Sequence, residues 1–287
     1  QLFLFGGLVT LAYLLHFTEI IPVVQQGFIC QDIALSKPFA GPSEAVPWPV
    51  LYAMAFGAPV VLVSNTLVLH GSFSLRSSRR QGSDKIHMFG HSSPIFIIVF
   101  REISLIKLIP CYPGLHLFGG CSALVLCGLG QVMTGSLAPY FLSVCSPNYT
   151  LLPVVSASPD GPSCVPATFI TDDICDGSAE EVYNARRSFP SLHATLSWYA
   201  AVFMAVSIPQ ERQGNLTTCF SRAFVFHYLY ASSALCLRGT RLIQPLLVMG
   251  LLALAFLSAA SRVTEYRSHA VDVLGGSVLG AAIAVYL

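Results

Sequence analysis

The sequence has very little charge. Only 10% of its 287 residues are Asp, Glu, Lys or Arg, whereas a soluble domain carries about 25%. The formal net charge of +1 creates no field that would attract nucleic acid. With 54% apolar residues, the chain resembles neither a disordered segment nor a disulfide-rich mini-protein. The composition therefore predicts one multi-span membrane domain rather than two soluble ones.

Uncharged, largely apolar stretches recur along the chain. About 20 residues cross a bilayer core of about 30 Å at about 1.5 Å per residue. We predict spans at about 2–24, 49–70, 113–133, 193–210, 242–261 and 273–287. Two shorter apolar runs, 93–100 and 223–237, are interpreted as re-entrant segments, interfacial segments or splice artefacts. The chain begins and ends inside apolar runs, so we expect a fragment, and a cleaved signal peptide is the alternative for the first run.

The distribution of basic residues predicts the orientation of these spans. Loops 71–112 and 211–241 hold ten of the fifteen Lys and Arg residues. Cytoplasmic loops are enriched in Lys and Arg, so we place these two loops in the cytoplasm. Loops 25–48, 134–192 and 262–272 then face the extracellular or luminal side.

Cysteines and glycosylation signals lie in the outer loops. Four of the nine cysteines are disulfide candidates there: Cys30, Cys145, Cys164 and Cys175. Cys164 with Cys175, or Cys145 with either, would staple the long loop, and the sequence does not choose among the pairings. Asn148 heads an Asn-Tyr-Thr glycosylation sequon, whereas the sequon at Asn215 is predicted to be cytoplasmic and bare. No Cys/His pattern predicts a zinc site, and we expect no metal and no cofactor.

Two polar clusters interrupt the apolar background at the same predicted membrane face. Residues 185–193 read ARRSFPSLH, and residues 261–272 read SRVTEYRSHAVD. Taken singly, arginines at span ends are commonly interfacial anchors. Taken together, the arginines can bind phosphate oxygens, a histidine can attack phosphorus or protonate a leaving group, and an aspartate can fix the imidazole tautomer. The clusters therefore predict a site for a phosphate group.

These clusters resemble the lipid phosphate phosphatase superfamily, the type 2 phosphatidic acid phosphatases. The signature stretches of that superfamily read K-x6-R-P, P-S-G-H and S-R-x5-H-x3-D. The likeness is greatest to the lipid phosphate phosphatase-related, or plasticity-related, proteins, and residues 130–135, 138–142, 145–150 and 185–193 carry it. It fails over about 71–112 and 207–238. The resemblance implies an all-α, integral membrane six-helix bundle of the phosphatidic acid phosphatase type 2, haloperoxidase-like architecture.

The chain departs from the superfamily pattern at positions that carry chemistry. In the first stretch, Gln131 stands in place of the lysine and Ala138 in place of a phosphate-binding arginine. In the second, Leu192 replaces glycine, and in the third, Ser268 stands where the superfamily has its nucleophilic histidine. The positions that match are Pro139, Pro190, Ser191, His193, Ser261, Arg262 and Asp272.

The matching positions imply the roles of the site residues. Ser191 and Arg262 would bind phosphate, His193 would be the leaving-group acid, and Asp272 would orient the nucleophile. His269 lies one residue beyond the nucleophile position, and a shift of one residue turns a side chain by about 100° on a helix. Because small misplacements are costly in catalysis, we treat His269 only as a substitute. Its separation from Asp272 falls from four residues to three, so the motif no longer secures that contact.

Three functional hypotheses follow. The preferred one is a non-catalytic, phospholipid phosphatase-related plasma-membrane protein that modulates lysophosphatidate-type signalling with a partly retained phosphate pocket. The alternative is an active phosphatidate phosphatase that uses His269 as nucleophile and His193 as acid. A transporter or channel is third, because no internal repeat is visible. The expected partners are membrane lipids with lysophospholipid or phosphatidate headgroups. A homo- or hetero-oligomer with related membrane proteins stays open, and nucleic acid is excluded.

Overall fold

The computed structural model describes residues 2–39, 41, 43–57, 59, 111–151, 155–158, 161–164, 168–207 and 243–287. Several predictions fall outside these residues. They include most of the predicted span 49–70, the short apolar runs, the loop 211–241, nearly all of the loop 71–112 and the sequon at Asn215.

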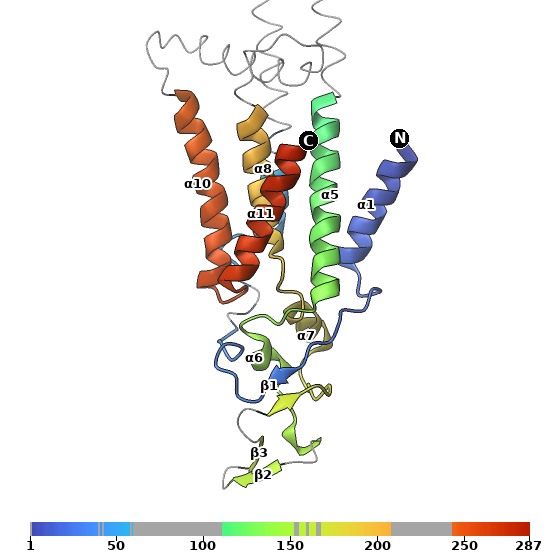
Figure 1. Cartoon of the computed structure of the whole chain (residues 1–287), viewed down its shortest axis with the longest axis vertical. Helices are drawn as coiled ribbons and strands as arrows, with labels where there is room; N and C mark the ends of the chain where they lie inside the picture. The colour runs from blue at the N-terminus through green and yellow to red at the C-terminus, as the bar shows by residue number, and fades with distance from the viewer. Residues whose placement is uncertain are drawn as a thin grey trace, which may run out of the picture.

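Long helices dominate the described residues. They are α1 (Leu2–Phe17), α5 (Cys111–Thr134), α8 (Leu192–Ser207), α10 (Ile243–Thr264) and α11 (Ala270–Tyr286). α1, α5 and α10 run toward the lower end in Figure 1, whereas α8 and α11 run away from it. The connections before α2, before α8 and between α10 and α11 therefore gather at that lower end, opposite both chain termini.

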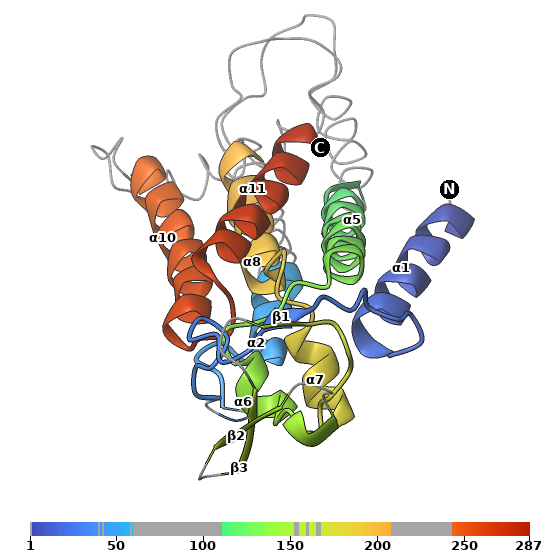
Figure 2. The same ribbon diagram turned by 60° about the horizontal axis from the view of Figure 1, so that its bottom comes forward.

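Short elements cover this loop end of the helices (Figure 2). The helical ones are α2 (Trp48–Tyr52), a π-helix (Ala53–Gly57), α6 (Phe141–Cys145), a 3-10 turn (Tyr149–Leu151) and α7 (Ala179–Ala185). Strand β1 (Phe28–Ile29) pairs antiparallel with β4 (Phe169–Ile170), and β2 (Val155–Ser158) pairs antiparallel with β3 (Gly161–Cys164). The fold is thus mostly helical, but the all-α prediction missed two small sheets, because strands of two to four residues leave no periodic signal.

Two helix ends differ from the predicted span ends. α1 ends at Phe17, although the predicted span continues to residue 24. Pro22 follows closely, and proline disfavours helix at the residue before it. α10 continues to Thr264, so Arg262 lies on its last turn and not in a loop beginning at 262. That difference places the Arg262 guanidinium on a rigid helix.

The helices that carry the two polar clusters pack closely on each other. Gly276 and Gly280 lie four residues apart on one face of α11, and a Cβ at either position would clash with the backbone carbonyl oxygen of Ser191 or Thr195 on α8. The Ser191 amide also donates to the Asp272 carbonyl at 3.0 Å. Close approach through small residues is typical of helix pairs in membranes. The contact fixes the start of α8 against the start of α11.

The outward helix surfaces are apolar. Among the described residues, Pro113–Thr134 is the one helix long and apolar enough to cross a bilayer by length and composition, and the other apolar helices have 10–17 residues. Large apolar side chains on the outside of the terminal helices are highly exposed: Phe3 97%, Leu246 71%, Val271 70% and Val278 62%. Water is a poor solvent for such surfaces. The pattern suits helices that meet lipid on one side.

Candidate phosphate-binding site

A cavity of about 410 Å³ lies at the loop end of the helices. Five of the site residues predicted from the sequence line it: Gln131, Ser191, His193, Arg262 and Ser268. Three predicted positions, Ala138, His269 and Asp272, are not among the lining residues. The further lining groups include the ionisable and aromatic side chains of His16, Glu44, Trp48, Tyr52, Tyr140, Arg187 and Arg267.

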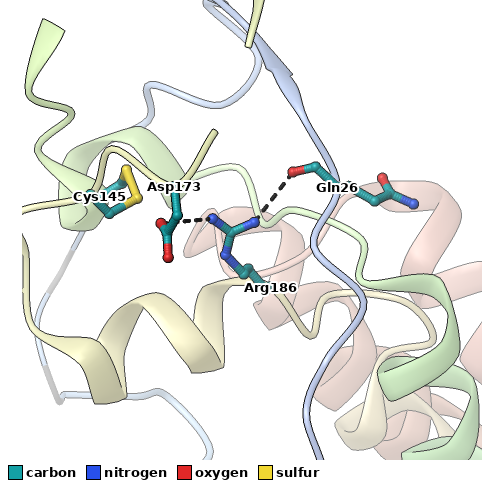
Figure 3. The surroundings of a disulfide bond; sticks show 5 residues. Gln26, Cys145, Asp173 and Arg186 are labelled. Atoms are coloured by element: carbon teal, nitrogen blue, oxygen red, sulfur yellow. Dashed lines mark hydrogen bonds and ion pairs between the residues drawn. A yellow bond between two sulfur atoms is a disulfide. The ribbon is translucent and has the colours of Figure 1, made fainter. Parts of the chain in front are cut away.

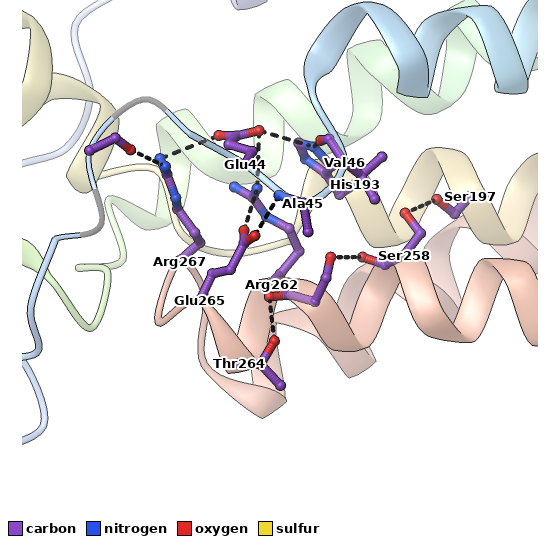
Figure 4. A network of polar contacts seen from close by, with 12 residues as sticks. Glu44, Ala45, Val46, His193, Ser197, Ser258, Arg262, Thr264, Glu265 and Arg267 are labelled. Atoms are coloured by element: carbon purple, nitrogen blue, oxygen red, sulfur yellow. Dashed lines mark hydrogen bonds and ion pairs between the residues drawn. The ribbon is translucent and has the colours of Figure 1, made fainter.

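Two arginines and one carboxylate form the charged side of the cavity (Figure 4). Arg262 Nη1 lies 3.3 Å from Glu44 Oε2, and Arg267 Nη1 lies 3.3 Å from Glu44 Oε1. Each of the three side chains is only 9% exposed. Glu265 approaches the Arg262 guanidinium from the other side, at 3.9 Å. Glu44 comes from the first outer loop, more than 200 residues away in the chain.

The hydrogen-bonding capacity of these arginines is only partly used. Arg262 Nε and Arg267 Nε are buried and have no hydrogen-bond partner among the described residues, and Arg262 Nη1 has only its ion pairs with Glu44 and Glu265. Burial lowers the pKa of the Arg262 guanidinium, and the Glu44 carboxylate opposes that change, although arginine remains a cation in proteins. Buried cations with free donors favour an anionic ligand.

His193 stands on the first turn of α8, beside the charged side. Its Nε2 lies 3.0 Å from the Val46 carbonyl oxygen and 3.6 Å from Glu44 Oε2. A carbonyl oxygen can only accept, so Nε2 carries the proton and donates to Val46. The Trp48 ring meets the imidazole edge to face, with centroids 4.2 Å apart. The first outer loop therefore occupies the nitrogen that faces the cavity's charged groups.

The neighbouring positions Ser268 and His269 have different surroundings. Ser268 is buried and lines the cavity, whereas the His269 backbone caps α11. His269 Nδ1 lies 3.3 Å from Asp272 Oδ2, and that oxygen also accepts from the His269 amide at 2.9 Å and from the Ser188 hydroxyl. The contact between His269 and Asp272, which the shortened spacing left open, is made because both residues belong to one capping box.

Asp272 is held as an anion by this capping box. Its burial alone would raise the pKa of the carboxyl, but the hydrogen bonds from His269 and Ser188 outweigh burial and lower the pKa. The carboxylate therefore stabilises the start of α11 and contacts His269 and the Ser188 hydroxyl. Among the described residues, no hydrogen bond joins it to the Ser268 hydroxyl.

The two substituted positions of the first signature stretch, Gln131 and Ala138, have different surroundings. Gln131 lines the cavity, donates from Nε2 to the Pro190 carbonyl at 3.0 Å and accepts at Oε1 from Arg187 Nη2 at 3.0 Å. Ala138 is 1% exposed and packs among apolar side chains away from the cavity. A cation is therefore present near position 131, supplied by Arg187, and absent at position 138.

The side chains of the adjacent residues Arg186 and Arg187 lie in different parts of the structure. Arg187 lines the cavity, but Arg186 braces the outer loops (Figure 3). Arg186 Nη1 donates to the Gln26 carbonyl at 3.2 Å, its Nη2 lies 3.6 Å from Asp173, and its guanidinium stacks 4.9 Å above the Phe141 ring. Arg186 thus connects neighbouring loop segments and is not among the residues that line the cavity.

The outer loops are crosslinked beside Arg186. Cys145 and Cys175 form a disulfide, which is one of the pairings that the sequence leaves open, and Cys30 is disulfide-bonded as well. Cys164 ends strand β3, and its side chain lies outside the described part of the structure. Asn148 Oδ1 accepts from the Thr150 hydroxyl at 2.6 Å, and its glycosylation stays a prediction.

Sequence reasoning missed the contribution of the loop 25–48 and of the helix α2 that follows it. Glu44, Trp48 and Tyr52 line the cavity, yet none of them belongs to a signature stretch. The available signal was weak: Glu44 is the last charged residue before a long uncharged run. Nothing local in the sequence indicates that this loop folds back onto α8 and α10.

The comparisons with known proteins agree with the resemblance. The model of the PAP2 superfamily matches residues 114–287. Phospholipid phosphatase-related protein type 5 of Mus musculus is 35% identical over 293 residues, covering 100% of this chain and 78% of the relative. The type 2 protein of Homo sapiens is 34% identical over 287 residues, covering 99% and 75%. The type 1 protein of Xenopus tropicalis is 32% identical over 295 residues, covering 100% and 77%. No solved structure gives a significant match.

Proposed function

This chain belongs to the PAP2 superfamily, among the phospholipid phosphatase-related proteins, and on that premise we propose that it binds lipid phosphate headgroups without hydrolysing them. Its role is to modulate signalling by lysophosphatidate-type lipids at a membrane, through the cavity at the loop end. Membership of the superfamily leaves no support for the transporter hypothesis.

The cationic side of the cavity supports binding. Arg187, Arg262 and Arg267 all line it, and free guanidinium donors of Arg262 and Arg267 are buried there. Arginine matches phosphate oxygens with a planar fork of donors. Tyr52 and Trp48 add an aromatic side that suits the glycerol or acyl portion of a lipid. The cavity thus offers groups for both ends of an amphiphilic ligand.

The observation that carries the proposal is the presence of Ser268, not His269, at the cavity. A serine attacks phosphorus only when an adjacent base takes its proton. Among the described residues, no histidine or carboxylate hydrogen-bonds the Ser268 hydroxyl, and Asp272 is occupied at the α11 cap. His193 donates to Val46, so its cavity-facing nitrogen is not free to act as a leaving-group acid.

One observation favours the alternative of an active phosphatidate phosphatase. The His269–Asp272 contact at 3.3 Å would leave Nε2 of His269 as the nucleophilic nitrogen. In this reaction Nε2 would form a bond to phosphorus as the lipid alkoxide leaves with a proton from His193, and water would then release phosphate. It requires the His269 ring to reach the cavity, which it does not line.

The proposed location is the plasma membrane, with the cavity facing the extracellular or luminal side. The exposed apolar faces of α1, α10 and α11 support embedding in lipid. The basic bias of loops 71–112 and 211–241 supports a cytoplasmic position for the opposite end. The disulfide Cys145–Cys175 suits an oxidising compartment on the cavity side.

Phosphate release by the purified full chain tests the proposal. The chain is incubated in mixed micelles with phosphatidate and with lysophosphatidate, beside a His193→Ala, His269→Ala double variant. We expect equal background release from both proteins, together with binding of the parent to phosphatidate nanodiscs in preference to phosphatidylcholine nanodiscs. Turnover that disappears in the double variant would establish the enzyme instead.

A further inference from the structure

The Glu44 carboxylate stands among the groups that would bind a phosphate. Both of its oxygens face cations: Oε1 meets Arg267 and Oε2 meets Arg262, each at 3.3 Å, and Oε2 lies 3.6 Å from His193 Nε2 (Figure 4). A carboxylate bridged by two arginines and a histidine has the same planar, anionic, acceptor-only character as two oxygens of a phosphate. Glu44 therefore occupies the position of an anionic headgroup.

The site residues themselves hold the segment around Glu44 in place. The Ala45 amide donates to Glu265 Oε1 at 2.5 Å, the Val46 carbonyl accepts from His193 Nε2 at 3.0 Å, and Arg267 Nη2 donates to the Gly41 carbonyl. The segment thus shares His193 and Arg267 with the cavity, whereas Glu265 is a carboxylate that is not among the lining residues. A ligand that takes over the arginines and His193 would remove these contacts of Glu44, Val46 and Gly41, and the hydrogen bond from Ala45 to Glu265 would remain.

The fit of the carboxylate is incomplete. The ion pair between Glu44 Oε2 and Arg262 Nη1 does not have the geometry of a hydrogen bond, and Arg262 Nε and Arg267 Nε remain without acceptors among the described residues. A phosphate has more oxygens than a carboxylate and one more negative charge in its dianionic form. A phosphomonoester would therefore satisfy donors that Glu44 leaves open.

We propose that Glu44 is an internal competitor for the phosphate subsite, so that headgroups bind only when residues 43–47 leave the arginines. This inference rests on the proposed function, because it concerns the same cavity, and it adds a residue that sets affinity and selectivity. With Glu44 in place, the two positive charges of Arg262 and Arg267 face the Glu44 and Glu265 carboxylates, and departure of Glu44 leaves one positive charge unbalanced. A dianionic phosphomonoester displaces the carboxylate more readily than a monoanionic phosphodiester does.

Removing the competitor raises the affinity for phosphate. The apparent affinity of a site that is only partly open is reduced by the open fraction. Glu44→Gln keeps the size of the side chain and deletes its charge, and we expect the half-saturating concentration of inorganic phosphate to fall about tenfold or more. The matched control is Glu180→Gln, the same chemical change at an exposed position on α7, which should leave phosphate binding unchanged.

Thermal unfolding of the purified full chain in detergent gives the first measurement. Inorganic phosphate is titrated against chloride at matched ionic strength, and the unfolding midpoint is recorded. Without phosphate, Glu44→Gln should unfold at a lower temperature than the parent, because two buried arginines lose their partner. Phosphate should restore its midpoint at about a tenth of the concentration that the parent needs, and adding Arg262→Gln should abolish the rescue.

A milder variant covers the case in which Glu44→Gln does not fold. Glu44→Asp keeps the charge but shortens the side chain, so that one carboxylate no longer reaches both arginines. We expect about a threefold gain in phosphate affinity from this variant. Unchanged or weaker phosphate binding in the folded variants would overturn the role of Glu44.

Lipid nanodiscs separate this inference from the proposed function. Binding of the parent and the Glu44→Gln variant is compared on phosphatidate and phosphatidylcholine nanodiscs. Equal binding of phosphatidate by both proteins, abolished by Arg262→Gln, would leave the proposed function standing and refute the competitor. A phosphate gain in Glu44→Gln without any preference for phosphatidate would support the competitor and refute the lipid function.

Discussion

The two sides of the cavity have departed from the superfamily pattern in different ways. On the α5 side, Gln131 keeps a place on the cavity wall, and Ala138 is buried among apolar side chains. On the α10–α11 side, Arg262 is retained, and the position of the nucleophile holds Ser268. The first side has uncharged residues where the superfamily has cations, and the second has a serine where the superfamily has its nucleophilic histidine. The proposed function follows from this difference: the cavity would hold a phosphate group through Arg262, and the position of the nucleophile would have no histidine.

The loss on the α5 side is partly offset by Arg187. An amide at position 131 can accept a hydrogen bond from the Arg187 guanidinium, as it does at 3.0 Å, whereas a lysine there would repel it. The Arg187 guanidinium also donates to the Leu15 carbonyl at 2.7 Å. The glutamine thus fits a cavity whose second cation approaches from the α8 end.

Restoring the superfamily arginine by Ala138→Arg should have the largest effect. Ala138 is 1% exposed, and its amide donates to the Ala185 carbonyl at 2.7 Å, so the long cation would be buried without a partner. We expect a destabilisation of about 4 kcal/mol or more, seen as loss of monodisperse protein in detergent. Gln131→Lys is the control, because its side chain reaches the cavity, and it should remain folded. A stable Ala138→Arg protein that binds phosphate more tightly would contradict the account, because it would show that position 138 reaches the cavity as position 131 does.

Removing the retained cation by Arg262→Gln should have the next largest effect. Its buried Nε has no acceptor among the described residues, and its Nη1 has only ion pairs with Glu44 and Glu265. These are the donors that a headgroup would use. The loss of about 3 kcal/mol of charge-assisted hydrogen bonding corresponds to about 100-fold weaker binding to phosphatidate nanodiscs.

Lys37→Gln is the matched control for that measurement. Lys37 is an outer-loop cation that lies 5.9 Å above the Tyr266 ring and does not line the cavity. Its removal should leave headgroup binding within about twofold of the parent. Equal losses from both substitutions would mean that headgroups respond to the general charge of the loop end and not to the cavity.

Asp272→Asn should have the smallest effect, because Asp272 acts as a helix cap. Its pKa is lowered in the folded protein, so the carboxylate stabilises the fold above its ordinary pKa of about 3.9, and this contribution is lost as the pH falls through the lowered value. We expect the asparagine variant to lose about 1 kcal/mol at neutral pH and to match the parent in strongly acidic solution. Thermal unfolding across pH measures the difference, and a gap that widened on acidification would contradict the sign.

The sequence predicted the parts of the site that lie within a few residues of one another. His193, Arg262 and Ser268 are assigned from short stretches with fixed spacing, and the structure brings all three to one cavity. Their roles in that cavity stay predictions. The uncharged stretches likewise predicted α5 and α10 closely, because an apolar run with few charges is a strong signal.

The rest of the site depends on contacts between distant segments, which the sequence could not reveal. Glu44 meets Arg262 across more than 200 residues, and its loop has no periodic pattern. The contact between His269 and Asp272 depends on the N-cap geometry of α11. His269 precedes the helix, so the helical repeat does not predict which residue its side chain meets. The choice of Cys145 with Cys175 likewise depends on how α6 and the outer loop fold together.

A search for phosphohistidine during turnover tests the central claim most directly. The purified full chain is incubated with phosphatidate labelled in its phosphate, quenched in alkali and mapped by mass spectrometry, with Ser268 and His269 both covered. Because no base among the described residues hydrogen-bonds the Ser268 hydroxyl and His269 does not line the cavity, we predict no phosphorylated residue above the level of a His193→Ala, His269→Ala variant. A phosphoryl group on His269 that accumulates and decays with phosphate release would contradict the account.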